Sequence, residues 1–240
     1  MLESMEDFDS DTREKNFFEL PEIKKLLGSV FGNIEHESDR GAVLIAQELI
    51  DNELTALLRA TAPDGMSKEK VDSLLGYPGV LATFSAKADV AYFAGLITSN
   101  LYESIHILRK IRNTAAHGSQ SFSLEPHRTK LVEVYRKLGD FGETQMEDFL
   151  RYMAIKLYIE PLADSFLEKQ KEDGIEEMRS AFKNREEIIE HIGKHPEALK
   201  IALDKLAKVE LGLAVVLLRG LIIFSGDRVL KARCKKVQME

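Results

Sequence analysis

The spacing of apolar residues between Ala42 and Leu58 constrains the fold more than any other feature of this chain. Apolar side chains recur there every three or four residues, so they share one face of a helix. Ser38 or Asp39 stands just before this run, where a side-chain oxygen can accept the first unpaired backbone N–H groups. The pattern therefore predicts a long amphipathic helix that begins near residue 39.

Helical spacing continues through most of the chain. Further helices are predicted over residues 67–75, from 84 or 85 to 95 or 96, and over 99–116, 131–138 and 144–171, with two or three more within 175–237. Gly118 is expected to end the helix over 99–116 in the left-handed conformation, and Pro161 to kink or divide the one over 144–171. No alternating run of Val, Ile or Thr indicates a sheet. The predicted class is all-α.

Charge is unevenly distributed along the chain. The 240 residues carry 33 basic and 40 acidic side chains, and residues 1–40 alone hold 5 basic and 11 acidic ones. Residues 219–236 carry a net charge of +5, which we interpret as a complement to a helix dipole followed by a solvated tail. Because nonspecific affinity for DNA comes from clustered Lys and Arg, direct DNA binding is not expected.

The chain is expected to divide into three segments. Residues 1–34 form an acidic arm and a short helix, residues 35–170 a helical core, and residues 171–240 a C-terminal helical extension. The most apolar run, Leu211 to Phe224, has 14 residues and contains Arg219, fewer than the ~20 that span a bilayer. We interpret it as a buried helix. Since Cys234 is the single cysteine, a reducing cytoplasm is the expected compartment and no membrane contact is expected.

One polar cluster lies at the end of the helix predicted over 99–116. Arg109, Asn113 and His117 follow one another at four-residue steps on one face, and Arg112 can lean toward His117. Such a set can cleave a phosphodiester: His117 moves a proton, Arg112 binds the phosphate and Asn113 orients either one. The alternative is structural, with His117 as a favourable cation at the helix end and Arg112 and Asn113 bonded to carbonyls or packed in a dimer seam. His106 shares this broad face and is expected to contact a neighbouring helix.

Metal and cofactor sites are not expected. Glu187, His191 and His195 stand at four-residue steps that can bind a divalent metal, but Gly193 and Pro196 lie where that helix would end. Nucleotide-binding glycine motifs and Cys/His zinc patterns are missing from the sequence.

The segment from Arg112 to His117, Arg-Asn-Thr-Ala-Ala-His, resembles the Arg-(four to six residues)-His motif of the HEPN superfamily. It ends the third helix of a four-helix arrangement, where HEPN domains carry their motif. The resemblance implies a HEPN-like four-helix core, here with additional C-terminal helices, in a homodimer whose two motifs meet across the interface. In catalytic members it implies metal-independent RNA cleavage.

A second resemblance covers more of the chain. The segments 37–46, 81–87, 91–97 and 111–117 together resemble the mannitol operon repressor family over about residues 35–125. This resemblance implies an all-helical transcriptional regulator without a helix-turn-helix.

Three charged residues at the start of the helix predicted near residue 39 fall within this second resemblance. Asp39 is expected to cap the helix, and either it or Glu37 to pair with Arg109 or Arg112, with Arg40 in a structural role beside it. The alternative is that an acid here positions the arginine that meets phosphate.

Two functions are consistent with these patterns. The preferred hypothesis is a cytoplasmic regulatory module that is not an enzyme and acts through a protein partner and self-association as a homodimer. The alternative is a metal-independent endoribonuclease, a toxin or defence effector, that uses Arg112 and His117 across a dimer and takes RNA as its substrate.

Overall fold

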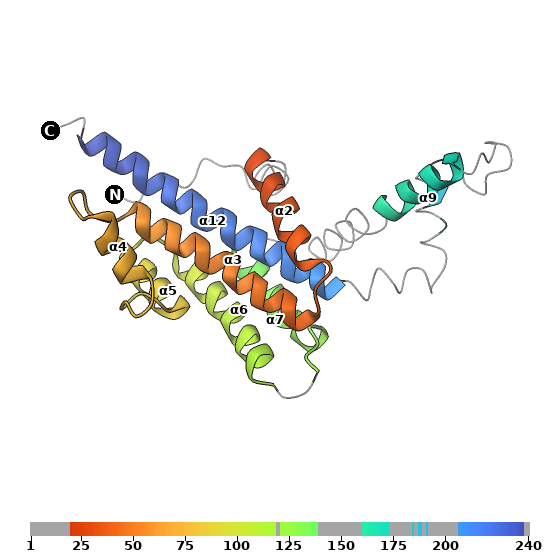
Figure 1. Ribbon diagram of the computed structural model, residues 1–240, viewed down its shortest axis with the longest axis horizontal. Helices are drawn as coiled ribbons and strands as arrows, with labels where there is room; N and C mark the ends of the chain where they lie inside the picture. Colours follow the sequence, from red (N-terminus) through yellow and green to blue (C-terminus); the bar gives the residue numbers. More distant parts are fainter. Residues whose placement is uncertain are drawn as a thin grey trace. The chain divides into compact units, whose positions relative to one another are not determined.

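The computed structural model describes residues 20–118, 121–138, 160–172, 184, 187–188, 191 and 206–237 (Figure 1). These residues form helices and their connections, without a strand. The helices are α2 (Pro21–Ile34), α3 (Asp39–Ala60), α4 (Lys68–Leu75), α5 (Phe84–Phe93), α6 (Ser99–His117), a short 3-10 turn (Glu125–His127), α7 (Arg128–Leu138), α9 (Glu160–Glu172) and α12 (Leu206–Val237). The predicted all-α class is confirmed.

Two compact units make up the chain. One takes its residues from 1–140 and 211–240 and contains α2 to α7 and most of α12, whereas the other takes its residues from 141–210 and contains α9. This division differs from the expected segments 35–170 and 171–240, because α12 returns to the first unit. Arg219 of α12 donates to Glu53 of α3 at 2.6 Å, and a Cβ atom on Gly212 would stand 2.6 Å from a ring carbon of Phe31.

The central helix of the first unit is α3, and its apolar spacing places it there. It packs against α2, α5 and α6, and Ile50 and Leu54 on its inner face are fully buried. Ser38 is the N-cap and accepts the Gly41 N–H at 3.1 Å. The long amphipathic helix and its predicted start are therefore confirmed.

The apolar run of α12 is buried, as its composition predicts. Residues 211–218 are all shielded from solvent, and Arg219 forms an ion pair with Glu53, so Arg219 does not belong to a solvated basic tail. None of the described helices combines the length and the apolarity needed to cross a membrane.

The end of α6 differs from the expectation. Gly118 follows the helix with φ −72° and ψ 127°, an extended conformation rather than the predicted left-handed one. Its carbonyl accepts a hydrogen bond from the Arg40 guanidinium at 2.9 Å, and its N–H bonds to the Thr114 carbonyl. Because a side chain from α3 supplies the donor, the chain leaves the helix without a left-handed turn.

One ion pair lies at the edge of the hydrophobic core. Lys87 of α5 is almost fully buried, with 6% of its side chain exposed, and its ammonium group lies 2.7 Å from Oδ2 of Asp51 on α3. The other carboxylate oxygen of Asp51, Oδ1, is buried without a hydrogen bond to any described residue. The Lys87–Asp51 ion pair therefore rests on one nitrogen–oxygen contact between α5 and α3.

Several predictions lie outside the described residues. They concern the acidic arm over 1–15, the helix over 144–159 that precedes Pro161, and the metal candidate His195. In the second unit, α9 begins at Glu160, and Pro161 stands in its first turn, where proline is tolerated.

Candidate functional site

The polar cluster predicted at the end of α6 is centred on His117 and Arg112. His117 is exposed in the last turn of the helix, at its carbonyl end. Arg112 and Asn113 are half-buried one turn earlier. His117 is thus open to solvent and to a ligand, whereas Arg112 borders the core.

The Arg112 guanidinium is incompletely bonded. One terminal nitrogen donates to Oδ1 of the neighbouring Asn113 at 3.5 Å, a weak contact. Its Nε is buried and has no hydrogen-bond partner in the described part of the chain. A buried donor left unpaired costs about 1–3 kcal/mol, more if charged. An anion on the solvent side of Arg112 would pair with its terminal nitrogens, whereas the buried Nε is out of its reach.

Asp39 and Arg40 hold the connection that follows α6. Oδ2 of Asp39 accepts the backbone N–H of Leu124 at 2.8 Å, while Arg40 donates to the Gly118 carbonyl. Asp39 forms no ion pair with Arg109 or Arg112 within the described ranges, so the predicted pairing is wrong for Asp39. Its carboxylate instead accepts a hydrogen bond from the backbone of the loop before α7. The cap expected from Asp39 is provided by Ser38.

Positive charge therefore gathers along α6 without a carboxylate from Asp39 to balance it. Arg109 is half-buried and Lys110 is exposed, and both act electrostatically on His106 in the direction that lowers its pKa. Together with Arg112, these side chains give the C-terminal half of α6 a cationic surface. Such a surface attracts phosphate or carboxylate groups.

An aromatic cluster lies on the same helix, closer to its N-terminus. The rings of Tyr92 and Tyr102 stack with centroids 4.6 Å apart, and His106 meets Tyr102 edge-on at 4.4 Å. The Tyr102 hydroxyl donates to Asp89 of α5 at 2.8 Å, which raises the pKa of Tyr102. His106 Nε2 lies 3.6 Å from the same carboxylate, so the predicted contact of His106 with a neighbouring helix is confirmed.

The sequence analysis did not single out Asp89, Tyr92 or Tyr102. Two helical spacings could have indicated this cluster. Asp89 and Tyr92 are three residues apart on α5, and Tyr102 and His106 are four apart on α6, so each pair shares one helix face. Burial is the main cause that lowers the pKa of His106 below 6.5, with Asp89 opposing it. His106 is therefore neutral near pH 7.

Metal ligation finds no support in the described ranges, where no group of three His, Cys, Asp or Glu side chains converges. Of the candidate ligands, Glu187 and His191 are described, whereas His195 is not.

Comparison with models of protein families, with curated proteins and with solved structures finds no match for this chain. The resemblances to the mannitol operon repressor family and to the HEPN superfamily therefore stay predictions. What the site can do follows from its own chemistry: an exposed imidazole and an under-bonded guanidinium on a cationic helix end can bind an anion and move a proton beside it.

Proposed function

We propose that this protein is a cytoplasmic regulatory module that self-associates as a homodimer and acts on transcription through contacts with a protein partner. The observation that carries the proposal is the exposure of large apolar side chains around α5. Tyr77 is 96% exposed and Val80 76% exposed before the helix, and Phe93 is 93% exposed at its end. Aromatic side chains of this kind are the usual anchors of protein interfaces.

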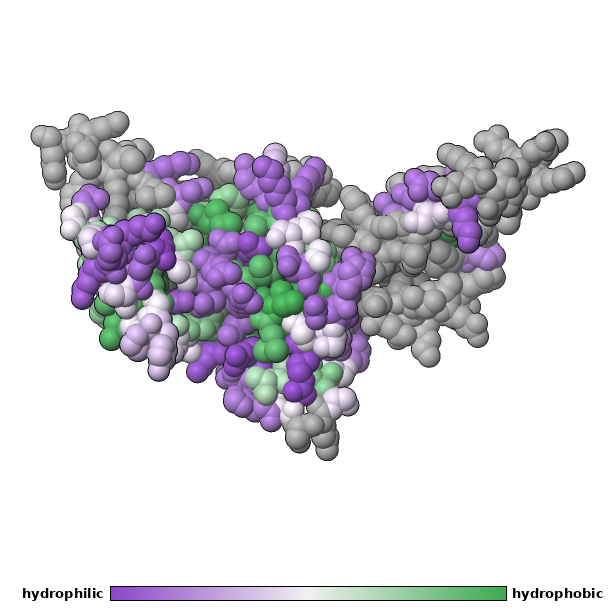
Figure 2. Space-filling model, viewed as in Figure 1, coloured by the Kyte–Doolittle hydropathy of each residue, from purple (hydrophilic) through white to green (hydrophobic). Residues whose placement is uncertain are grey.

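The surface in Figure 2 supports self-association. Hydrophilic residues cover most of this face, and hydrophobic ones gather in a patch over the part of the first unit where α3 runs in Figure 1. Leu44 of α3 is among the exposed large apolar residues. An apolar patch rimmed by polar residues is typical of a protein contact surface.

The experiment compares transcript levels in a deletion strain with those in strains that carry Phe93→Asp or Phe93→Leu. We expect Phe93→Asp to reproduce the transcript changes of the deletion, because a charge at an apolar anchor prevents its burial. Phe93→Leu keeps the apolar surface and is expected to leave transcription near the wild-type pattern. Tight, sequence-selective DNA binding by the purified protein alone at physiological salt would contradict the proposal.

A second candidate function rests on the state of Arg112 and His117. An under-bonded guanidinium and an exposed imidazole favour RNA cleavage over a purely structural role, since neither side chain is both buried and fully hydrogen-bonded. In this mechanism His117 of one protomer removes the 2′-hydroxyl proton as that oxygen attacks phosphorus. A second proton donor, supplied by the partner protomer, protonates the departing 5′-oxygen. Arg112 stabilises the charge on the phosphate oxygens.

The assay incubates single-stranded RNA and structured tRNA with the purified protein in the presence of EDTA. Under this second function, cleavage leaves 2′,3′-cyclic phosphate ends and is lowered about 10²-fold or more by His117→Ala. Arg112→Ala is expected to have a comparable effect. The matched control is His191→Ala, which removes another exposed histidine, in the second unit. Intact RNA after long incubation with the wild-type dimer would exclude this candidate.

A further inference from the structure

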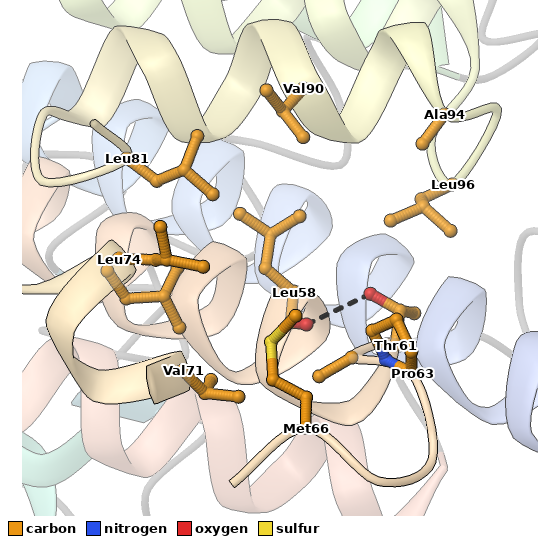
Figure 3. A pocket seen from close by; sticks show the side chains of 12 residues that line it. Leu58, Thr61, Pro63, Met66, Val71, Leu74, Leu81, Val90, Ala94 and Leu96 are labelled. Carbon is orange, nitrogen blue, oxygen red and sulfur yellow. Dashed lines mark hydrogen bonds between the residues drawn. The ribbon is translucent and has the colours of Figure 1, made fainter. Parts of the chain in front are cut away.

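An apolar pocket lies away from the cationic end of α6, at the other end of α3. It opens between the C-terminal end of α3, the short helix α4 and α5 (Figure 3), and its volume is about 200 Å³. Leu58 of α3 and Val90 of α5 point toward one another across the space, and Leu96 closes one side. Almost all of the lining is aliphatic.

The polar atoms near the pocket are already bonded. The Thr61 hydroxyl donates to the Leu58 carbonyl at 3.0 Å, and the neighbouring Arg59 and Asp72 pair with each other. A charged or strongly polar ligand would therefore lose its hydration without gaining a partner. An uncharged apolar ligand meets no such penalty and buries hydrocarbon surface.

Backbone hydrogen bonds hold the walls in place. The Leu81 N–H bonds to the Leu74 carbonyl at 2.9 Å, which fixes the end of α4 to the segment that enters α5, and the Leu96 N–H bonds to the Ala91 carbonyl at 2.9 Å. The fold itself therefore shapes the pocket, through bonds within the chain. A pre-formed pocket spares a ligand the cost of ordering its own site.

We propose that this pocket binds a small uncharged hydrocarbon, about the size of a benzene ring with a short alkyl chain. An apolar cavity of about 150 Å³ stays dry and binds benzene, so this pocket has room for a ring and a few further carbons. A helical peptide would need several anchor sites along a groove, and this compact pocket offers one. The site is independent of the function proposed above.

The experiment follows methyl resonances of the full-length protein, labelled at Leu, Val and Met, during titration with butylbenzene and with benzoate. We expect saturable shifts at Leu58, Val71, Val90 and Leu96 with butylbenzene and none with benzoate, whose charge finds no partner. Val90→Phe fills the space and should weaken butylbenzene binding at least tenfold. Val132→Phe, the same substitution on α7 outside the pocket, should leave it unchanged.

A second filling variant and a dilution series without ligand serve as controls. Ala94→Leu fills the pocket from a different position and gives a second test if Val90→Phe fails to fold, which circular dichroism reports. Non-saturable shifts, or equal binding by a folded filling variant, would overturn the proposal. Shifts of the same methyl groups on dilution without ligand would also overturn it, because they would show that a second copy of the chain occupies the pocket.

Discussion

The ion pair between Lys87 and Asp51 offers the sharpest test of how α5 is held on α3. The Lys87 ammonium is almost fully buried and lies 2.7 Å from one oxygen of Asp51, whose side chain is 28% exposed. Asp51→Ala removes the partner and leaves a buried positive charge. Lys87→Met instead leaves a carboxylate on a side chain that is 28% exposed, with Oδ1 buried.

The two substitutions should therefore differ in magnitude. Breaking a buried pair by removing one partner costs about 3–5 kcal/mol, and the partial exposure of Asp51 places Asp51→Ala near the lower end, at about 3 kcal/mol. Lys87→Met should cost less, about 1–2 kcal/mol, because the Asp51 side chain that remains is 28% exposed even though its Oδ1 is buried. The double variant carries no buried charge, so we expect a coupling energy of about 2 kcal/mol between the two sites.

Urea unfolding of the four proteins at neutral pH measures these free energies, and amide hydrogen exchange in α3 and α5 shows whether the loss is local. The control is Arg59→Ala, which breaks the ion pair between Arg59, also on α3, and Asp72 of α4. Those side chains are 44% and 46% exposed, so the change should stay within about 1 kcal/mol. Equal costs for Asp51→Ala and Arg59→Ala, or additive single-site effects, would refute the argument that burial sets the strength of the pair.

Four further substitutions test other features of the fold by urea unfolding. Gly212→Ala should destabilise the fold by about 1–3 kcal/mol, because its Cβ clashes with the ring of Phe31 on α2. Gly28→Ala, which has open space around it, should stabilise the fold by about 0.5–1 kcal/mol. A loss of stability in both variants would point to the backbone rather than the clash. Asp39→Asn keeps an acceptor for the loop N–H before α7 but loses its charge, and should cost about 1 kcal/mol; no change would show that the contact contributes nothing. Burial lowers the pKa of His106 from 6.5, so the unfolded chain binds the proton more tightly and stability falls as the pH drops below about 6.5. His106→Phe should reduce this fall between about pH 7.5 and about pH 5.5, with His127 supplying the remainder in the same direction, and an unchanged pH slope would contradict the assignment.

The helices could be predicted from the sequence because each one follows local rules. The three- and four-residue spacing and the cap at Ser38 located α3, and the apolar run from Leu211 indicated a buried helix. What could not be predicted was the unit to which that helix belongs. Its docking depends on the fit of Gly212 against Phe31 and on the ion pair of Arg219 with Glu53, contacts that join residues far apart in the sequence.

The candidate site was predictable in part for the same reason. The shared helix face of Arg109, Asn113 and His117 is a local property of α6. The partner of Asp39 was not predictable, because backbone groups of a loop compete with arginine for its carboxylate and leave no mark in the sequence.

The hydrogen bonds of Asp39 and Arg40 to the segment after α6 affect how this region tolerates cleavage and mutation. Arg40 fastens the chain at Gly118, and Asp39 fastens it again at Leu124. A protease that cut at Phe122, between the two anchors, would leave α6 and α7 attached to the same turn of α3. Both helices are thus attached to α3 through residues at the two ends of this link. Sequence drift can therefore reshape the surface beside His117 while the helices that carry it keep their packing.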